Sequence, residues 1–231
     1  MRTVVERGFT VIELMLFLAV SGLLFAMLMV GVGTNINQQM YRNDVTDFKT
    51  LLQDQYADVL TPQNISSTIT CNSVEGDRGA TSCVILGKSV QLDGRDITIS
   101  NVIGFDTQVD LSGKTDIEAF QEYAPYDATD DVYREKLNIT LKNTSAAGSG
   151  SMQSTMLVLR SPVNGLIRFY WASGLKRPAD VLGNVSTQEL QICAGNSIES
   201  ASVPVQLITI DPAIAGVAAV SSQDSSGECP S

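Results

Sequence analysis

Residues 8–33 read GFTVIELMLFLAVSGLLFAMLMVGVG, and this run decides the first part of the fold because it holds a single charged residue, Glu13. From Phe9 to Gly33 a helix rising about 1.5 Å per residue would reach roughly 37 Å, more than the ~30 Å hydrocarbon core of a bilayer. An ordinary secretory signal has a shorter apolar core and a cleavage site of small residues, and no such site follows here. The run therefore predicts a membrane-spanning helix.

The charges on either side of this run predict its orientation. Arg2 and Arg7 outweigh Glu6 before the run, whereas Asp44 and Asp47 follow it. Because positive residues favour the cytoplasmic side, we expect the N-terminus in the cytoplasm and the remainder of the chain outside.

The carboxylate of Glu13 needs an explanation, because a charge near the centre of a membrane helix costs on the order of 2.5–3.5 kcal/mol on insertion scales. Glu13 either lies at the cytoplasmic interface or has a charged partner.

The first thirty residues resemble the N-terminus of type IV prepilins and pseudopilins. A short basic leader ends at Gly8, and Phe9, Thr10, Val11, Ile12, Glu13 and an unbroken apolar helix follow it. The resemblance implies a leader over residues 1–8, cleavage between Gly8 and Phe9 by a membrane-embedded prepilin peptidase, and methylation of the new amine of Phe9.

The spacing of these residues has a physical rationale. Cleavage would expose a cationic amine on Phe9 one helical turn before Glu13. At the edge of a low-dielectric environment an unpaired charge is unfavourable, so each of these two charges needs a partner. Pairing between neighbouring chains would let Glu13 of an incoming subunit select the amine of the previous one and fix the axial register. Pairing within one chain is the alternative.

The helix is expected to continue beyond the membrane. Between residues 34 and 61 apolar positions recur every three or four residues with acidic and basic residues between them, which predicts an amphipathic helix. Those apolar positions are Tyr41, Val45, Phe48, Leu52, Tyr56 and Val59. Pro62 predicts the stop, so one helix should run from Phe9 to about Leu60.

Residues 62–231 have a composition and patterning typical of β-structure. Strands are expected at Ser67–Thr70, Ser82–Leu86, Asp96–Val102, Lys136–Lys142, Thr155–Arg160, Leu166–Ala172, Glu189–Cys193 and Val203–Ile210. Thr115 and Glu118 have the spacing of a capping box and predict one short helix. Asn143–Ser154 is expected to be a polar loop and Ser221–Ser231 a polar tail. The sequence thus predicts an α+β fold, in which a long N-terminal helix packs on one antiparallel β-sheet domain, as in pilins.

Four cysteines, Cys71, Cys83, Cys193 and Cys229, all fall in the part expected outside the membrane. An even number in an exported domain predicts two disulfides, most simply Cys71–Cys83 and Cys193–Cys229, although three pairings exist. The resemblance supports the second pair, because many pilins have a C-terminal disulfide. Without histidine or a Cys-x-x-Cys motif, a zinc site is disfavoured.

The sequence points away from an enzyme. Histidine is absent, which excludes Ser-His-Asp and Cys-His catalytic sets, and no phosphate-binding glycine motif is present. The densest acidic group is Asp127, Asp130 and Asp131, for which a solvated loop is the simplest interpretation and calcium the functional alternative. No other cofactor is expected. The net charge of −10 disfavours DNA as a partner, and a local patch at Arg160, Arg168, Lys176 and Arg177 beside Tyr170 and Trp171 is the one alternative for nucleic acid.

Taken together, these features predict a structural subunit of a type IV pilus-like filament, a pilin or minor pilin that supports adhesion, twitching motility or DNA uptake. Its partners would be other pilin subunits, the prepilin peptidase, the pilus assembly machinery and the membrane. It would reside in the cytoplasmic membrane before assembly and then become part of an extracellular pilus. A pseudopilin of a secretion or competence system, and an anchored binding domain that never polymerises, remain the alternatives.

Overall fold

A computed structural model describes residues 10–61, 83–105, 110–128, 132–144, 152–186, 188–196, 205–214 and 216–225. Several predicted features lie outside these residues: the leader with Gly8, Phe9, the strand Ser67–Thr70, Cys71, Cys229, Asp130 and Asp131.

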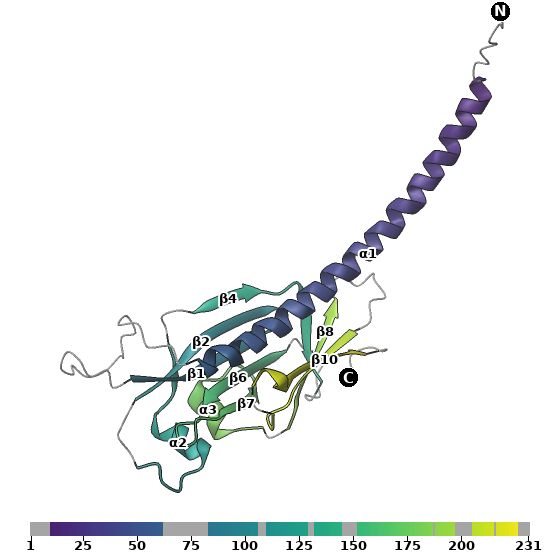
Figure 1. The fold of residues 1–231 in the computed structure, drawn as a ribbon. Coiled ribbons are helices and arrows are strands. Elements are labelled where there is room, and N and C mark those ends of the chain that lie inside the picture. Colours follow the sequence, from purple (N-terminus) through teal and green to yellow (C-terminus); the bar gives the residue numbers. More distant parts are fainter. Residues whose placement is uncertain are drawn as a thin grey trace, which may run out of the picture. The chain divides into compact units, whose positions relative to one another are not determined.

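The fold is α+β, and the chain divides into two compact units, one ending at Arg42 and one starting at Asn43 (Figure 1). The elements in chain order are α1 (Val11–Leu60), β1 (Cys83–Asp93), β2 (Asp96–Phe105), α2 (Asp116–Glu122), β3 (Tyr126–Asp127), β4 (Tyr133–Lys136), β5 (Ile139–Asn143), β6 (Gln153–Arg160), β7 (Ile167–Ser173), α3 (Pro178–Gly183), β8 (Leu190–Asn196), β9 (Val205–Ile210), a 3₁₀ turn (Val217–Ala219) and β10 (Val220–Ser225).

Helix α1 is continuous over 50 residues, which confirms the prediction of a single long helix. Gly22, Gly31 and Gly33 do not break it, although each glycine weakens a helix by about 1 kcal/mol relative to alanine. The helix ends at Leu60, two residues before Pro62, as expected from the bias of a pre-proline residue away from helical geometry.

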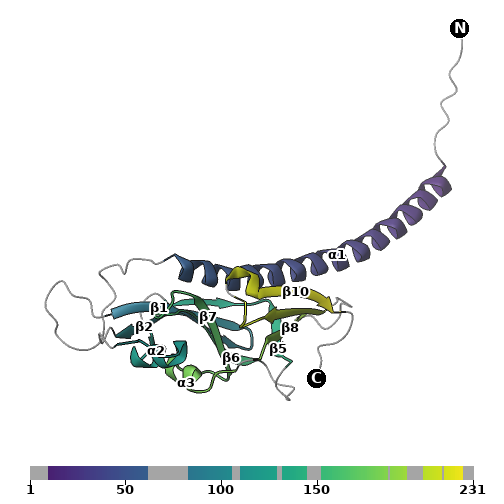
Figure 2. The ribbon, with the colours of Figure 1, turned by 60° about the horizontal axis from the view of Figure 1, so that its bottom comes forward.

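The second half of α1 packs on the sheet through the stripe that its periodicity predicts. Its buried apolar side chains in the second unit are Val45, Phe48, Leu52, Tyr56 and Val59. Tyr56 stacks on Phe169 of β7 with ring centroids 6.4 Å apart. Figure 2 shows this part of α1 on one face of the β-sheet, with α2 and α3 on the other face.

Two antiparallel sheets form the centre of the second unit. The larger has the order β3-β2-β1-β6-β7, with β4 also paired to β2, and the smaller has the order β10-β9-β8-β5. Strand β1 shifts register between Ile85 and Gly87, and a Cβ at Gly87 would lie 2.0 Å from the carbonyl oxygen of Val158, so only glycine fits at this position.

The face of the larger sheet opposite α1 is covered by the two short helices. Phe120 of α2 and Val181 and Leu182 of α3 are buried against Leu157 and Tyr170 of the sheet. The capping box predicted for α2 is present: Thr115 accepts from the backbone of Glu118, whose carboxylate accepts from the backbone of Thr115. This reciprocal bonding satisfies two backbone donors at the start of α2.

Several sequence-based expectations for this unit are wrong. The expected strand Lys136–Lys142 is two strands, β4 and β5, which belong to different sheets. Residues 221–225, expected in the polar tail, form β10 and pair with β9. Gln153 and Ser154, expected at the end of a polar loop, belong to β6 and pair with β1. Short strand β3 and helix α3 were not expected at all.

Candidate functional site

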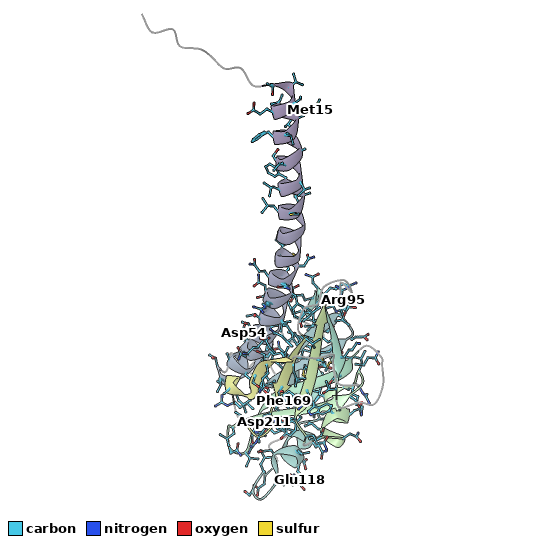
Figure 3. All side chains as sticks on the ribbon, turned by 90° about the vertical axis from the view of Figure 1, so that its right-hand side faces the viewer. Met15, Asp54, Arg95, Glu118, Phe169 and Asp211 are labelled. Atoms are coloured by element: carbon cyan, nitrogen blue, oxygen red, sulfur yellow. The ribbon has the colours of Figure 1, made fainter. Side chains whose placement is uncertain are left out.

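The N-terminal part of α1 presents an exposed apolar surface among the described residues. In the part of the chain that the structure describes, one helix is long and apolar enough to cross a membrane, over Val11–Met29, and none of that window is buried. Phe17 is 70% exposed and Phe25 69%. Figure 3 shows side chains projecting from several sides of the helix around Met15. Exposure of such an apolar surface to water is unfavourable, so lipid or another protein is expected to cover it.

Glu13 lies in the first turn of α1. Its backbone N–H donates to Thr10 Oγ1 at 3.3 Å, and the N–H of Leu14 donates to the carbonyl oxygen of Thr10 at 3.1 Å. Thr10 therefore caps the helix, and Glu13 occupies the third helical position, where the helix dipole favours a negative charge.

The capping geometry was accessible from the sequence, because Thr10-x-x-Glu13 has the same form as Thr115-x-x-Glu118, but the sequence analysis did not use it. It accounts for an acidic residue at this end of the helix. It does not neutralise the carboxylate: among the described residues, no cation forms an ion pair with Glu13.

Cys193 is buried in β8 and disulfide-bonded, as the sequence predicts. The pairings Cys193–Cys229 and Cys71–Cys83 each include a residue outside the described part, so both remain predictions. A disulfide at β8 ties this strand of the smaller sheet to another part of the chain.

Asp127 does not lie in a solvated loop. It forms β3 and is half-buried, its Oδ1 accepts from Ser100 Oγ at 2.8 Å, and its Oδ2 accepts from Gln91 Nε2 at 3.4 Å. Burial raises the pKa of the Asp127 carboxyl, and the hydrogen bond from the Ser100 hydroxyl opposes that rise. The described residues contain no group of three or more histidine, cysteine or acidic side chains arranged for a metal, and calcium remains an untested prediction because Asp130 and Asp131 lie outside them.

The basic residues considered for nucleic acid do not form one patch. Arg160 and Arg168 lie at one end of the β6–β7 hairpin, whereas Lys176 and Arg177 follow its other end. Tyr170 and Trp171 are buried, so neither offers a ring face on which bases could stack. β7 lies at the end of its sheet, so Arg168 is on an edge strand.

Acidic side chains gather beside the second half of α1. A groove of about 210 Å³ is lined by Asp44, Asp47 and Asp54 of the helix and by Glu135 of β4. Burial, followed by repulsion from Asp47, raises the pKa of the Asp44 carboxyl. This groove accounts for part of the negative charge of the chain and repels anions.

Comparisons of the chain with protein-family models, with curated proteins and with solved structures find no significant match.

Proposed function

We propose that this protein is a structural subunit of a type IV pilus-like filament, which assembles through the apolar first half of α1. The observation that carries the proposal is the exposed segment Val11–Met29, which begins two residues after Phe9 and holds one carboxylate at Glu13. The resemblance of residues 8–33 to prepilins is the reason for proposing a type IV pilus-like filament rather than another kind of assembly.

The energetics of the helix allow it to move from lipid into a helical bundle at little cost in apolar transfer. Moving Val11–Met29 from lipid into a bundle of like helices exchanges one apolar environment for another, so apolar transfer contributes little. Close packing of side chains and the charge of Glu13 then decide whether the bundle forms. An amine from a neighbouring Phe9 would remove most of the ~2.5–3.5 kcal/mol that the carboxylate costs in the bilayer.

The globular unit fits the same function. Five apolar side chains from the second half of α1 are buried in this unit, and that half continues the same helix whose first half would form the filament core. In the filament the sheets would lie outside the bundle, and the chain would act as a building block rather than as a catalyst.

The proposal is tested by substitution of Glu13, with surface filaments sheared from cells and quantified against the membrane-bound pool. Glu13→Ala is expected to insert normally but to lower the filament yield at least tenfold, because an uncompensated amine would remain in the bundle. Glu13→Gln keeps the side-chain length and removes the charge, so it should fail as well.

Thr10→Ala is the matched control, because it removes the cap of α1 and leaves the carboxylate in place. If pairing with the amine matters, Thr10→Ala assembles nearly as the wild type does. Normal filament yield from Glu13→Ala would contradict the proposal, and equal losses from Thr10→Ala and Glu13→Ala would assign Glu13 to capping instead.

A further inference from the structure

Among the described strands, β6 alone pairs with β7, and the hydrogen-bond pattern of the outer edge of β7 can be read from the two ends of the β6–β7 hairpin. At one end the N–H of Ser161 donates to the carbonyl of Leu166, and at the other the N–H of Gly174 donates to the carbonyl of Gln153. Pairs alternate along an antiparallel ladder between hydrogen-bonded and non-hydrogen-bonded. Counting from either end, the N–H and C=O of Phe169 point away from β6.

One end of this edge is already engaged. The carbonyl of Trp171, which shares the outward direction, accepts from the N–H of Ser186 at 3.2 Å. Among the described residues, the outward groups of Ile167 and Phe169 have no backbone partner. The segment at Ser186 therefore covers one position of the edge, and no described backbone group pairs with the outward groups of the next two residues, Phe169 and Ile167, which are 4% and 5% exposed.

A depression of about 400 Å³ adjoins these open positions. Its apolar wall comes from four separate elements: Ile117, Phe169, Val185, Pro212 and Ala213. The depression is shallow and open, so a chain segment that lies across the edge fits it better than an enclosed small molecule does.

The polar side chains of the depression offer donors rather than acceptors. The carboxylate of Asp116 is engaged by three donors: the hydroxyl of Ser161, the amide of Asn164 at 3.4 Å and Nε of Arg168 at 2.6 Å. Arg168 uses only Nε in this pair, and its two terminal nitrogens have no partner among the described residues. Together with the outward N–H of Phe169, the terminal nitrogens of Arg168 give this region more hydrogen-bond donors than acceptors without a partner among the described residues. Such a region suits a ligand that carries a carboxylate.

We propose that the edge of β7 between Ile167 and Phe169 binds an extended segment of a partner polypeptide that carries an aliphatic residue next to a carboxylate. The segment adds one short strand to the larger sheet, as in recognition by β-augmentation. Its aliphatic side chain enters the depression beside Ile117, and its carboxylate meets the terminal nitrogens of Arg168. This surface lies in the globular unit and does not depend on the filament function.

The test measures amide exchange of the full chain in detergent micelles at residue resolution, with and without the acetylated peptide Thr-Val-Thr-Val-Thr-Asp at millimolar concentration. Strand addition should slow exchange at Ile167 and Phe169 and leave Arg168 and Tyr170 unchanged, because β6 already pairs with the latter two. The same peptide with proline in place of its second valine lacks one N–H and should give no protection.

Arg168→Gln is expected to weaken peptide binding about tenfold, whereas Arg160→Gln, on the same hairpin but outside the depression, should bind as the wild type does. A thermal unfolding curve for each variant establishes that it is folded. Absence of protection at Phe169, or equal protection with the proline peptide, would overturn strand addition. Unchanged affinity in a folded Arg168→Gln variant would overturn the assignment of the carboxylate.

Discussion

The hydroxyl of Tyr56 gives the sharpest stability prediction, because it is buried without a hydrogen-bond partner among the described residues. The side chain is 2% exposed and its ring stacks on Phe169. Burial, followed by the negative charge of Asp211, raises the pKa of the Tyr56 hydroxyl far above its ordinary value. Figure 3 labels Phe169 and Asp211, which mark this region of the second unit.

The expected effect of Tyr56→Phe follows from this geometry. A buried hydroxyl without a partner costs about 1–3 kcal/mol, and phenylalanine keeps the ring and its stacking while removing that cost. Taking the lower end of the range, we expect stabilisation by about 1 kcal/mol, which for a unit of this size raises Tm by about 2–4 °C. Tyr56→Ala also removes the ring and should destabilise by about 3–5 kcal/mol.

The assay is urea unfolding of the full chain in detergent, followed by tryptophan fluorescence and checked by thermal denaturation. Tyr133→Phe is the matched control, because its hydroxyl is exposed and donates to Glu135 at 2.7 Å. It should change the unfolding free energy by less than about 0.5 kcal/mol. Destabilisation by 1 kcal/mol or more in Tyr56→Phe would refute the reasoning, since it would require a partner for the hydroxyl in the folded state.

Three further predictions concern the same unit. Thr115→Ala removes the acceptor for the backbone of Glu118 and should lower the unfolding free energy by about 1 kcal/mol in urea titrations; an unchanged midpoint would contradict the cap. Because burial raises the pKa of Asp127, its contribution to stability is full below the ordinary carboxyl pKa and is lost as pH rises through the raised pKa. Between pH 4 and pH 7 the unfolding free energy should therefore fall less in Asp127→Asn than in the wild type. An equal fall in both proteins would contradict this assignment. Reduction of the disulfide at Cys193 should lower the unfolding free energy by about 2–5 kcal/mol, and an unchanged transition after complete thiol labelling would contradict its stabilising role.

Some parts of the fold were predictable because their signals are local. The apolar stripe from Tyr41 to Val59 has helical spacing, and every predicted position is buried. The capping box at Thr115 marks the start of α2 within one residue. In both cases the residues that determine the structure lie within one or two turns of each other.

Other parts depend on pairings that no local pattern contains. Residues Ser221–Ser225 are polar on both faces, and they form a strand because β9 pairs with them and Lys49 of α1 donates to Ser222. The chain leaves one sheet and enters another at Leu137 and Asn138, within a run whose alternation looks uninterrupted. Helix α3 had a readable signal, with Pro178 at its first position, which the sequence analysis missed.

Length and composition predicted the membrane-spanning segment of the candidate assembly surface. The spacing Thr10-x-x-Glu13 also contained a signal for the helix cap, which the backbone hydrogen bond from Glu13 to Thr10 makes evident. The position of β7 at the end of its sheet could not be predicted, since the order of strands in a sheet depends on pairing between distant parts of the chain.

The most direct test of the central claim is intact-protein mass spectrometry with N-terminal peptide mapping on material sheared from the native cell surface. The account predicts a chain that begins at methylated Phe9 and is recovered in filaments. A chain that still begins at Met1 and is confined to membranes would contradict it, and would make the protein an anchored domain that does not polymerise.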